Sequence, residues 1–495
     1  MNRSIPLHTL SAEELHKAFV EGEYSAVAIT SHFLGRIISL DKALGSFLQI
    51  TCDRALAKAE ELDAMRAAKM PLGPLAGVPI AVKDNIHIYG ERTTCASRML
   101  ENYVAPFSAT AIERIEAAGG IIIGKTNLDE FAMGSSSEHS AYGLTRNPWD
   151  RTLSPGGSSG GSAVAVAARL APLSLGTETG GSVRQPAAFC GITGFKPTYG
   201  RVSRYGLVAF GSSLDQIGPF ATNARDAALL FETIAGHCAR DSTSIREAAP
   251  RILNALNTPI RDLRIGVPWK QLDQLPADSF NHFEGALELF KSLGAKLVEV
   301  DLSLAQHAVA IYYILSSAEA STNLARFDGI RYGLRAKEAT TLDEVYTLSK
   351  KEGFGSEVKR RLLFGTFVLS SGYQEAFYTQ AQKVRSLLID QYRAAFSHCS
   401  LIATPTSPQG AFRVGGMRNP LSEYLQDIYT IPASLTGMPA ASTPSGFDAE
   451  GRPLGLQLIG PLNADALVLQ AAHQFEELLQ WRQIPPGYEM EAIDG

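Results

Sequence analysis

Two serines and one lysine stand in surroundings that favour nucleophilic chemistry. Ser158 and Ser182 both lie in glycine-rich segments, and Lys83 ends the apolar run Val78-Pro-Ile-Ala-Val. A serine hydroxyl is a weak nucleophile unless a base takes its proton, and a lysine serves as that base when burial disfavours its charged form. The sequence therefore makes Lys83 a candidate base for a serine hydrolase, whereas a lysine considered alone would be a surface charge.

The turn before Ser182 supplies a second catalytic feature. In Gly176-Thr-Glu-Thr-Gly-Gly-Ser182, the glycines let successive N–H groups point at one spot without obstruction by a Cβ atom. Such a set of donors forms an oxyanion hole. We therefore expect Thr179, Gly180 and Gly181 to stabilise a tetrahedral intermediate formed on Ser182.

The glycine-rich segments allow three other interpretations. A flexible linker would run into polar surface, but the Ser158 segment continues into the apolar Ala163-Val-Ala-Val-Ala-Ala. Nucleotide binding is disfavoured because neither G-x-x-x-x-G-K-[ST] nor G-x-G-x-x-G occurs at these glycines. Gly157 to Gly161 satisfies G-x-S-x-G, which would make Ser159 the nucleophile, but that motif requires a buried strand just before it and Asp150 to Pro155 is not one.

The elements that must position these residues alternate between strand and helix. Lys83 is expected at the end of a buried strand over 78–83, and residues 158–177 read as a core helix followed by a strand. The clearest α/β signal is the helix predicted over 278–293 between strands at 264–267 and 295–300. Further predicted elements are helices over the first 60 residues and over 109–118 and 464–479, the last capped by Asn463, and strands at 121–124, 401–404 and 454–459.

Composition limits the class of protein. The 495 residues exceed the roughly 250 to 300 that one hydrophobic core serves, so a large domain or two fused lobes is expected. A net charge of -5 without a long basic run disfavours nucleic-acid binding by this chain alone. The five scattered cysteines suggest neither a disulfide framework nor a zinc site. No signal peptide or membrane span is evident, so we expect a cytoplasmic protein with no bound metal and no membrane association.

The three segments around Lys83, Ser158 and Ser182 together resemble the amidase signature family in order and spacing. The two serines are 182 - 158 = 24 residues apart, as in that family. The resemblance implies a central mixed β-sheet with helices on both faces. It further implies that Ser182 is the acyl-forming nucleophile, that Ser158 relays the proton after a cis Gly157–Ser158 peptide bond, and that Lys83 is the base.

Segments outside the triad resemble one branch of the family, the A subunits of glutamyl-tRNA(Gln) amidotransferases. They include Gly194-Phe-Lys-Pro-Thr-Tyr-Gly-Arg and Phe354-Gly-Ser-Glu-Val-Lys-Arg-Arg, while His139 stands where asparagine is common. The resemblance implies glutamine as substrate, with Asp427 at its α-ammonium group, Arg361 at its α-carboxylate and Tyr312 as a further contact. Residue type alone would make both charges surface residues, and Arg360 is the alternative partner of the carboxylate.

The same resemblance implies partners. Ammonia would pass to a B subunit that uses ATP and Mg to activate tRNA-borne glutamate, with a C subunit joining the interface, and this chain would need no cofactor. Two alternatives remain: a free-standing amidase of small or aliphatic carboxamides, and a catalytically idle scaffold. We expect a helical cover over 1–60, a core with the triad over 61–245, and a second α/β part over 246–495 that completes one integrated domain.

Overall fold

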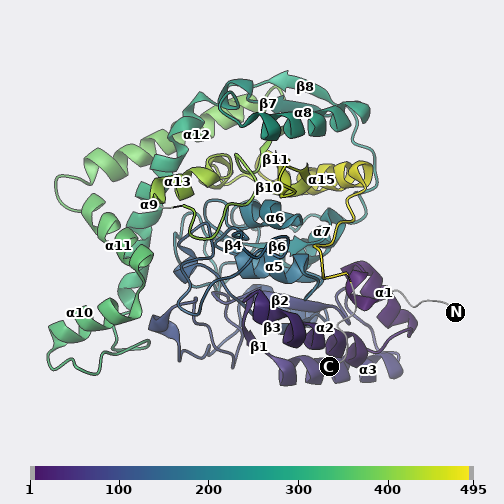
Figure 1. Ribbon diagram of the computed structural model, residues 1–495, viewed down its shortest axis with the longest axis horizontal. Coiled ribbons are helices and arrows are strands. Elements are labelled where there is room, and N and C mark those ends of the chain that lie inside the picture. Colours follow the sequence, from purple (N-terminus) through teal and green to yellow (C-terminus); the bar gives the residue numbers. More distant parts are fainter. Residues whose placement is uncertain (1–5, 418, 490–495) are drawn as a thin grey trace.

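In the described part of the chain, a mixed sheet of eleven strands forms the centre of the protein and carries the candidate site (Figure 1). The computed structural model describes residues 6–417 and 419–489. The strands lie in the order β1-β3-β2-β4-β6-β5-β10-β11-β9-β7-β8, with parallel pairs such as β2–β4 and antiparallel pairs such as β4–β6. They are β1 (Phe47–Ile50), β2 (Pro79–Lys83), β3 (Ile121–Thr126), β4 (Leu173–Glu178), β5 (Thr193–Lys196), β6 (Gln216–Ala221), β7 (Arg264–Val267), β8 (Lys296–Glu299), β9 (Leu401–Pro405), β10 (Ala440–Phe447) and β11 (Pro453–Ile459).

Helices cover both faces of this sheet, as the strand β2 illustrates. Ile80 and Val82 belong to one buried cluster with residues of α4, α7 and α15, whereas Ala81 belongs to another with α2, α3 and α5. Successive side chains of a strand point to opposite faces, so both faces of β2 are buried. The predicted α/β class and mixed, doubly covered sheet are confirmed. The helices are α1 (Ala12–Glu21), α2 (Ala26–Leu40), α3 (Cys52–Ala67), α4 (Thr110–Ala117), α5 (Gly160–Ala167), α6 (Arg184–Cys190), α7 (Ala224–Ile234), α8 (Ala277–Ser292), α9 (Ala308–Asn323), α10 (Leu342–Gly353), α11 (Ser356–Val368), α12 (Gln380–Ala395), α13 (Pro420–Tyr424), α14 (Ile431–Leu435) and α15 (Asp465–Leu479).

Most elements expected from the sequence are present. The helix–strand pair after Ser158 is α5 and β4, and β7, α8 and β8 form the predicted α/β unit. Two expectations need correction. The first 60 residues are not only helical, because β1 pairs with β3 at one edge of the sheet. Asn463 does not cap α15, because its N-cap is Ala464 and the Asn463 side chain accepts a hydrogen bond from Arg201 at 2.8 Å instead. The proposed three-part division of the chain stays a prediction.

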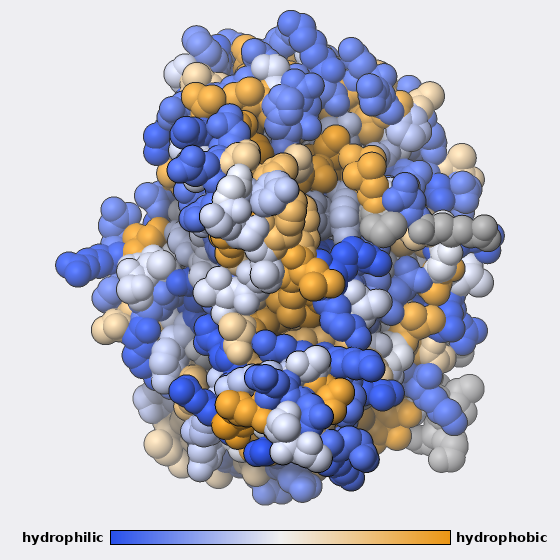
Figure 2. All heavy atoms as spheres, turned by 90° about the vertical axis from the view of Figure 1, so that its left-hand side faces the viewer, coloured by the Kyte–Doolittle hydropathy of each residue, from blue (hydrophilic) through white to orange (hydrophobic). Residues whose placement is uncertain are grey.

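Helices α9 to α12 lie together on the left-hand side of Figure 1. A close approach between α9 and α11 depends on Gly365, because a Cβ atom there would overlap the carbonyl oxygen of Ser317. On its outward face, α11 and the short helix that follows it expose large apolar side chains. Figure 2 shows hydrophobic residues gathered between hydrophilic margins on this side. We call this surface the α11 patch, and its members are Leu363, Phe364, Phe367, Tyr373 and Phe377.

None of the helices in the described part of the chain combines the length and the apolar character needed to cross a membrane.

Candidate active site

Lys83 lies at the centre of the candidate site, fully buried at the carboxyl end of β2. Its ammonium nitrogen donates hydrogen bonds to the hydroxyls of Ser158 and Ser159, both at 2.8 Å, and to the carbonyl of Thr177 at 3.3 Å. Burial lowers the pKa of Lys83 from 10.5 to about 7, against the opposing charge of Asp129. A lysine with this pKa is available in its neutral, proton-accepting form near pH 7.

The topology of the sheet explains why the distant motifs meet. β2 and β4 are parallel neighbours, so their carboxyl ends lie on the same side of the sheet. Lys83 at the end of β2 is therefore close to the turn that follows Glu178 at the end of β4. Ser158 lies just before α5, and the Ser159 amide donates a hydrogen bond to the carbonyl of Ser182 at 3.3 Å. The three residues predicted to act together are therefore brought together from three parts of the chain.

The loop that carries Ser158 is fixed on both sides. The Gly157–Ser158 peptide bond is cis, as the resemblance implied. The amide of Gly157 donates to the side-chain oxygen of Gln185 at 2.9 Å, and the carbonyl of Ser158 accepts a hydrogen bond from the amide of Asp129 at 3.2 Å. These contacts hold the Ser158 hydroxyl against Lys83.

Ser159 does not fit the alternative role of nucleophile at an elbow. The preceding strand along the chain, β3, ends at Thr126, so no strand leads into this serine. The Ser159 side chain is fully buried, donates to the carbonyl of Thr177 at 3.0 Å and accepts a hydrogen bond from Lys83. Ser159 thus helps to hold the lysine, a contact that the sequence did not indicate.

The turn from Thr179 to Ser182 follows β4 and remains partly accessible at its end, where Ser182 is 7% exposed. Among the described residues, no acceptor is found for the backbone amides of Thr179, Gly180, Gly181 or Ser182. Unpaired buried N–H groups are uncommon in proteins. This set of free donors beside a serine hydroxyl has the composition of an oxyanion hole.

A buried ion pair that was not expected from the sequence shapes this turn. The Glu178 carboxylate pairs with Arg184 and accepts the amides of Val183 and Arg184 at 3.0 and 3.2 Å. The Arg184 guanidinium also donates to the carbonyl of Gly180 at 3.3 Å. Both residues stand inside the motif that contains Ser182, so their charge in an otherwise uncharged stretch was an available signal.

Asp427 lies directly against the turn. An added Cβ at Gly181 would be 2.6 Å from the Asp427 carboxylate, so only glycine allows this approach. The other carboxylate oxygen accepts the hydroxyl of Ser135 at 2.5 Å. Burial raises the pKa of Asp427 to about 7, although the Ser135 hydrogen bond opposes that rise. The carboxylate is thus buried rather than at the surface.

Arg361 is also buried, with 3% of its surface exposed, and it stacks within 4.9 Å of the Tyr313 ring and 5.5 Å of the Tyr424 ring. Its Nε donates to Glu357 at 2.8 Å. Within the described residues, its terminal nitrogens have no protein acceptor. Arg360 differs, because its side chain is 52% exposed and bonds to the other oxygen of Glu357. Of the two arginines, Arg361 is therefore the one that is buried and has free N–H donors with which to bind a carboxylate.

Tyr312 connects α9 to the turn. Its hydroxyl hydrogen-bonds with the Thr179 hydroxyl at 2.7 Å, and its ring lies about 3 Å from where a side chain at Gly180 would begin. Burial raises the pKa of Tyr312 to about 12, so its hydroxyl stays protonated. The charge of Arg361 opposes this rise in pKa, and that of Asp427 adds to it.

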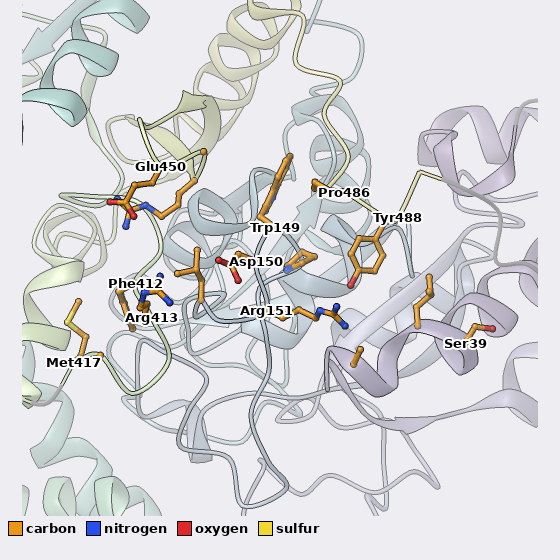
Figure 3. Close-up of a pocket in the computed structure, with 18 residues that line it drawn as sticks. Ser39, Trp149, Asp150, Arg151, Phe412, Arg413, Met417, Glu450, Pro486 and Tyr488 are labelled. Atoms are coloured by element: carbon orange, nitrogen blue, oxygen red, sulfur yellow. The ribbon is translucent and has the colours of Figure 1, made fainter.

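The structure contains a cavity beside the site and a roomier one away from it. One of about 410 Å³ is lined by His139 and by Glu357, the hydrogen-bond partner of Arg361. A roomier one of about 930 Å³ lies elsewhere, among Ser39, Arg151, Phe412 and Tyr488, and its lining includes none of the triad (Figure 3). No group of three or more histidine, cysteine, aspartate or glutamate side chains among the residues described is arranged to hold a metal ion.

A buried lysine bonded to serine hydroxyls, beside a turn of free amides, is the arrangement of an amide-hydrolysing serine enzyme. The Amidase family model matches residues 28–469 of the chain. The chain belongs to the amidase family, and the resemblance found in the sequence is confirmed.

Relatives and solved structures narrow this assignment. The chain is 55% identical over 480 residues to the A subunit of glutamyl-tRNA(Gln) amidotransferase from Protochlamydia amoebophila (strain UWE25), covering 97% of this chain and 98% of that protein. It is 50% identical over 489 residues to the same subunit of Chlamydia abortus (strain DSM 27085 / S26/3), covering 99% of each. The crystal structure of this subunit from Thermotoga maritima has a TM-score of 0.79 and 40% identity over 96% of each chain. A bacterial aryl acylamidase, at 24% identity and a TM-score of 0.86 over 97% of this chain and 99% of that one, shares the fold alone.

Proposed function

We propose that this protein hydrolyses the side-chain amide of glutamine and supplies the ammonia to a tRNA-dependent amidotransferase. The observation that carries the chemistry is the buried Lys83, 2.8 Å from the Ser158 hydroxyl and next to the turn of Ser182. Neutral Lys83 accepts the Ser158 proton while Ser158 accepts that of Ser182. Ser182 Oγ then bonds to the amide carbon, and the oxyanion lies on the amides of Thr179, Gly180 and Gly181.

The intermediate collapses when the carbon–nitrogen bond breaks and the relay returns a proton to the departing nitrogen, which leaves as ammonia. A γ-glutamyl ester on Ser182 remains. Water then attacks this ester, the relay takes one of its protons, and glutamate leaves as the Ser182 hydroxyl is restored. Every proton taken up by Lys83 is returned within the cycle, and none of the proposed steps uses a cofactor of this chain.

The α-amino-acid end of glutamine requires one anion and one cation, because a buried zwitterion needs a partner for each charge. We assign the α-ammonium group to Asp427, the α-carboxylate to the free nitrogens of Arg361, and a polar contact to Tyr312. The Glu357 carboxylate holds the arginine in place by accepting a hydrogen bond from Arg361 Nε at 2.8 Å. Because a fold does not by itself set the substrate, we assign the choice of glutamine to these two charges.

The names of the relatives support the second half of the proposal. We infer a cytoplasmic complex in which a B subunit converts Glu-tRNA(Gln) to Gln-tRNA(Gln) with ATP and Mg, a C subunit joins the interface, and tRNA contacts mainly the B subunit. The acidic net charge of -5 agrees with tRNA binding elsewhere. The α11 patch supports a protein partner, because contiguous exposed apolar surface marks interaction sites.

Reconstitution tests this function. The chain is co-expressed with B- and C-type subunits, and two products are measured: glutamate released from glutamine and Gln-tRNA(Gln) formed from Glu-tRNA(Gln). Both are expected from the wild-type assembly. The Ser182→Ala assembly is expected to form neither from glutamine, but to form Gln-tRNA(Gln) when ammonium chloride is added. Hydrolysis of simple aliphatic amides without hydrolysis of glutamine would instead favour a free-standing amidase.

A further inference from the structure

One charged pair beside the site has no part in the mechanism above. His139 Nε2 lies 3.6 Å from a carboxylate oxygen of Glu423, with 27% and 10% of the two side chains exposed. His139 lines the cavity of about 410 Å³ next to Glu357, which supports Arg361. Because both side chains are largely buried, solvent screens the attraction between them less than it screens a surface ion pair.

Glu423 is connected through one residue to Asp427, the proposed partner of the α-ammonium group. Its Oε1 atom accepts the backbone amide of Ser135 at 2.9 Å, and the Ser135 hydroxyl donates to Asp427 Oδ2 at 2.5 Å. Glu423 therefore fixes the backbone from which the hydroxyl reaches Asp427. Ser135 is thus the link between Glu423 and the Asp427 carboxylate.

The same segment reaches the proton relay. The carbonyl of Ser135 accepts the Gln185 amide at 3.0 Å, and the Gln185 oxygen accepts the Gly157 amide at 2.9 Å. The backbone amide of His139 donates to Asp129 at 3.2 Å, and the Asp129 amide bonds to the carbonyl of Ser158. Gly157 and Ser158 are thereby joined to the segment held by the pair.

Charge explains why a cation belongs at position 139. The carboxylates of Asp129, Glu423 and Glu357 all act on His139. Burial lowers the pKa of His139, but the contact with Glu423 and the charge of Asp129 outweigh burial and raise it to about 9. The remaining charged groups around this cavity are Arg98, Glu130, Glu138, Lys351, Glu352 and Lys359. The pKa of Asp427 is in turn raised mainly by burial and further by the charges of Glu178 and Glu423, whereas the Ser135 hydrogen bond and the charge of Arg184 lower it.

We propose that His139 and Glu423 form a positioning pair that holds Ser135, and through it presents Asp427 to the α-ammonium group of glutamine while steadying the Ser158 loop. The inference rests on the proposed glutaminase function. The protonated imidazole offsets the Glu423 carboxylate, which would otherwise oppose ionisation of Asp427. The pair thus acts through Asp427 and Ser135 and touches no reacting atom.

Two substitutions separate charge from shape. Glu423→Gln keeps an oxygen that accepts the Ser135 amide but removes the negative charge, and His139→Asn removes the cation. Because ionised Asp427 binds the ammonium group, the pH below which KM for glutamine rises marks the Asp427 pKa. We expect that pH to move down in Glu423→Gln and up in His139→Asn, with a rise in KM of about tenfold near pH 7 in the latter.

The measurement is a pH series of kcat and KM for glutamine on the assembled complex, with a short uncharged amide as second substrate. Glu352→Gln is the matched control, because it removes a carboxylate from the same cavity without reaching Ser135. The positioning role is supported if the two variants shift the KM profile in opposite directions, if KM for the uncharged amide is unchanged, and if the Glu352→Gln profile matches that of the wild type. Equal shifts in both variants, or unaltered KM profiles with wild-type turnover, would overturn it. Failure of the wild type to hydrolyse glutamine would instead reject the proposed function.

Discussion

The pH dependence of turnover follows from the burial of Lys83. The fall of its pKa from 10.5 to about 7 corresponds to about 5 kcal/mol against protonation in the folded protein. At pH 7, roughly half of such lysines are neutral, compared with about one in 3,000 for a lysine in water. Only the neutral form takes the proton of Ser158. We therefore expect kcat to fall tenfold per pH unit below about 7, to about 1% of its plateau at pH 5.

The assay is glutamate release at saturating glutamine from pH 5 to 9, because kcat reports groups in the substrate complex, where Asp427 is paired with the ammonium group. Lys196 is a suitable control. It is a second buried lysine whose pKa burial lowers to about 7, but its nitrogen donates to the carbonyl of Pro197 outside the site. The Lys196→Met variant should show the same fall in kcat below about pH 7 as the wild type. A kcat that stays constant down to pH 5 would refute the role of Lys83 as base.

The remaining predictions concern the relay, the substrate ends and the partner surface. Ser158→Ala should lower kcat by about 10³-fold or more, whereas Ser159→Ala, which removes contacts to Lys83 and Thr177 but no member of the relay, should retain measurable turnover; equal losses would contradict the relay role of Ser158. Asp427→Asn should raise KM for glutamine about 10- to 100-fold and leave that for an uncharged amide unchanged, as steady-state kinetics would show. Leu363→Glu should reduce co-purification of partner subunits, while Ile38→Glu, at an exposed apolar residue of α2, should not; retention in both would reject the α11 patch as an interface.

The sequence predicted those parts of the fold whose apolar pattern is uninterrupted. Val78 to Lys83 and the helix after Ser158 are buried on all sides, so their composition alone indicated core elements. Strands β6 and β10 were not anticipated because each contains glycine and proline, and proline lacks the N–H group that a ladder needs. In β10 the register shifts between Pro444 and Gly446, which accommodates the interruption.

The site shows a similar division. Glycine-rich turns and the position of Lys83 are local properties, so they could be read from spacing. The burial of Arg361 could not, because it depends on Tyr313 and Tyr424 from other helices, and a lone arginine in sequence is usually exposed. The contribution of Ser135 was also hidden, since it acts through a contact with Asp427 across 292 positions of the chain.

Direct detection of the acyl-enzyme tests the central claim most closely. The assembled complex is mixed with glutamine, quenched in acid within one turnover and digested, and the peptides are examined by mass spectrometry. A γ-glutamyl adduct is expected on Ser182, and it should be absent from the Ser182→Ala complex. An adduct on Ser158 or Ser159, or glutamine turnover by the Ser182→Ala complex, would contradict the assignment of Ser182 as the nucleophile.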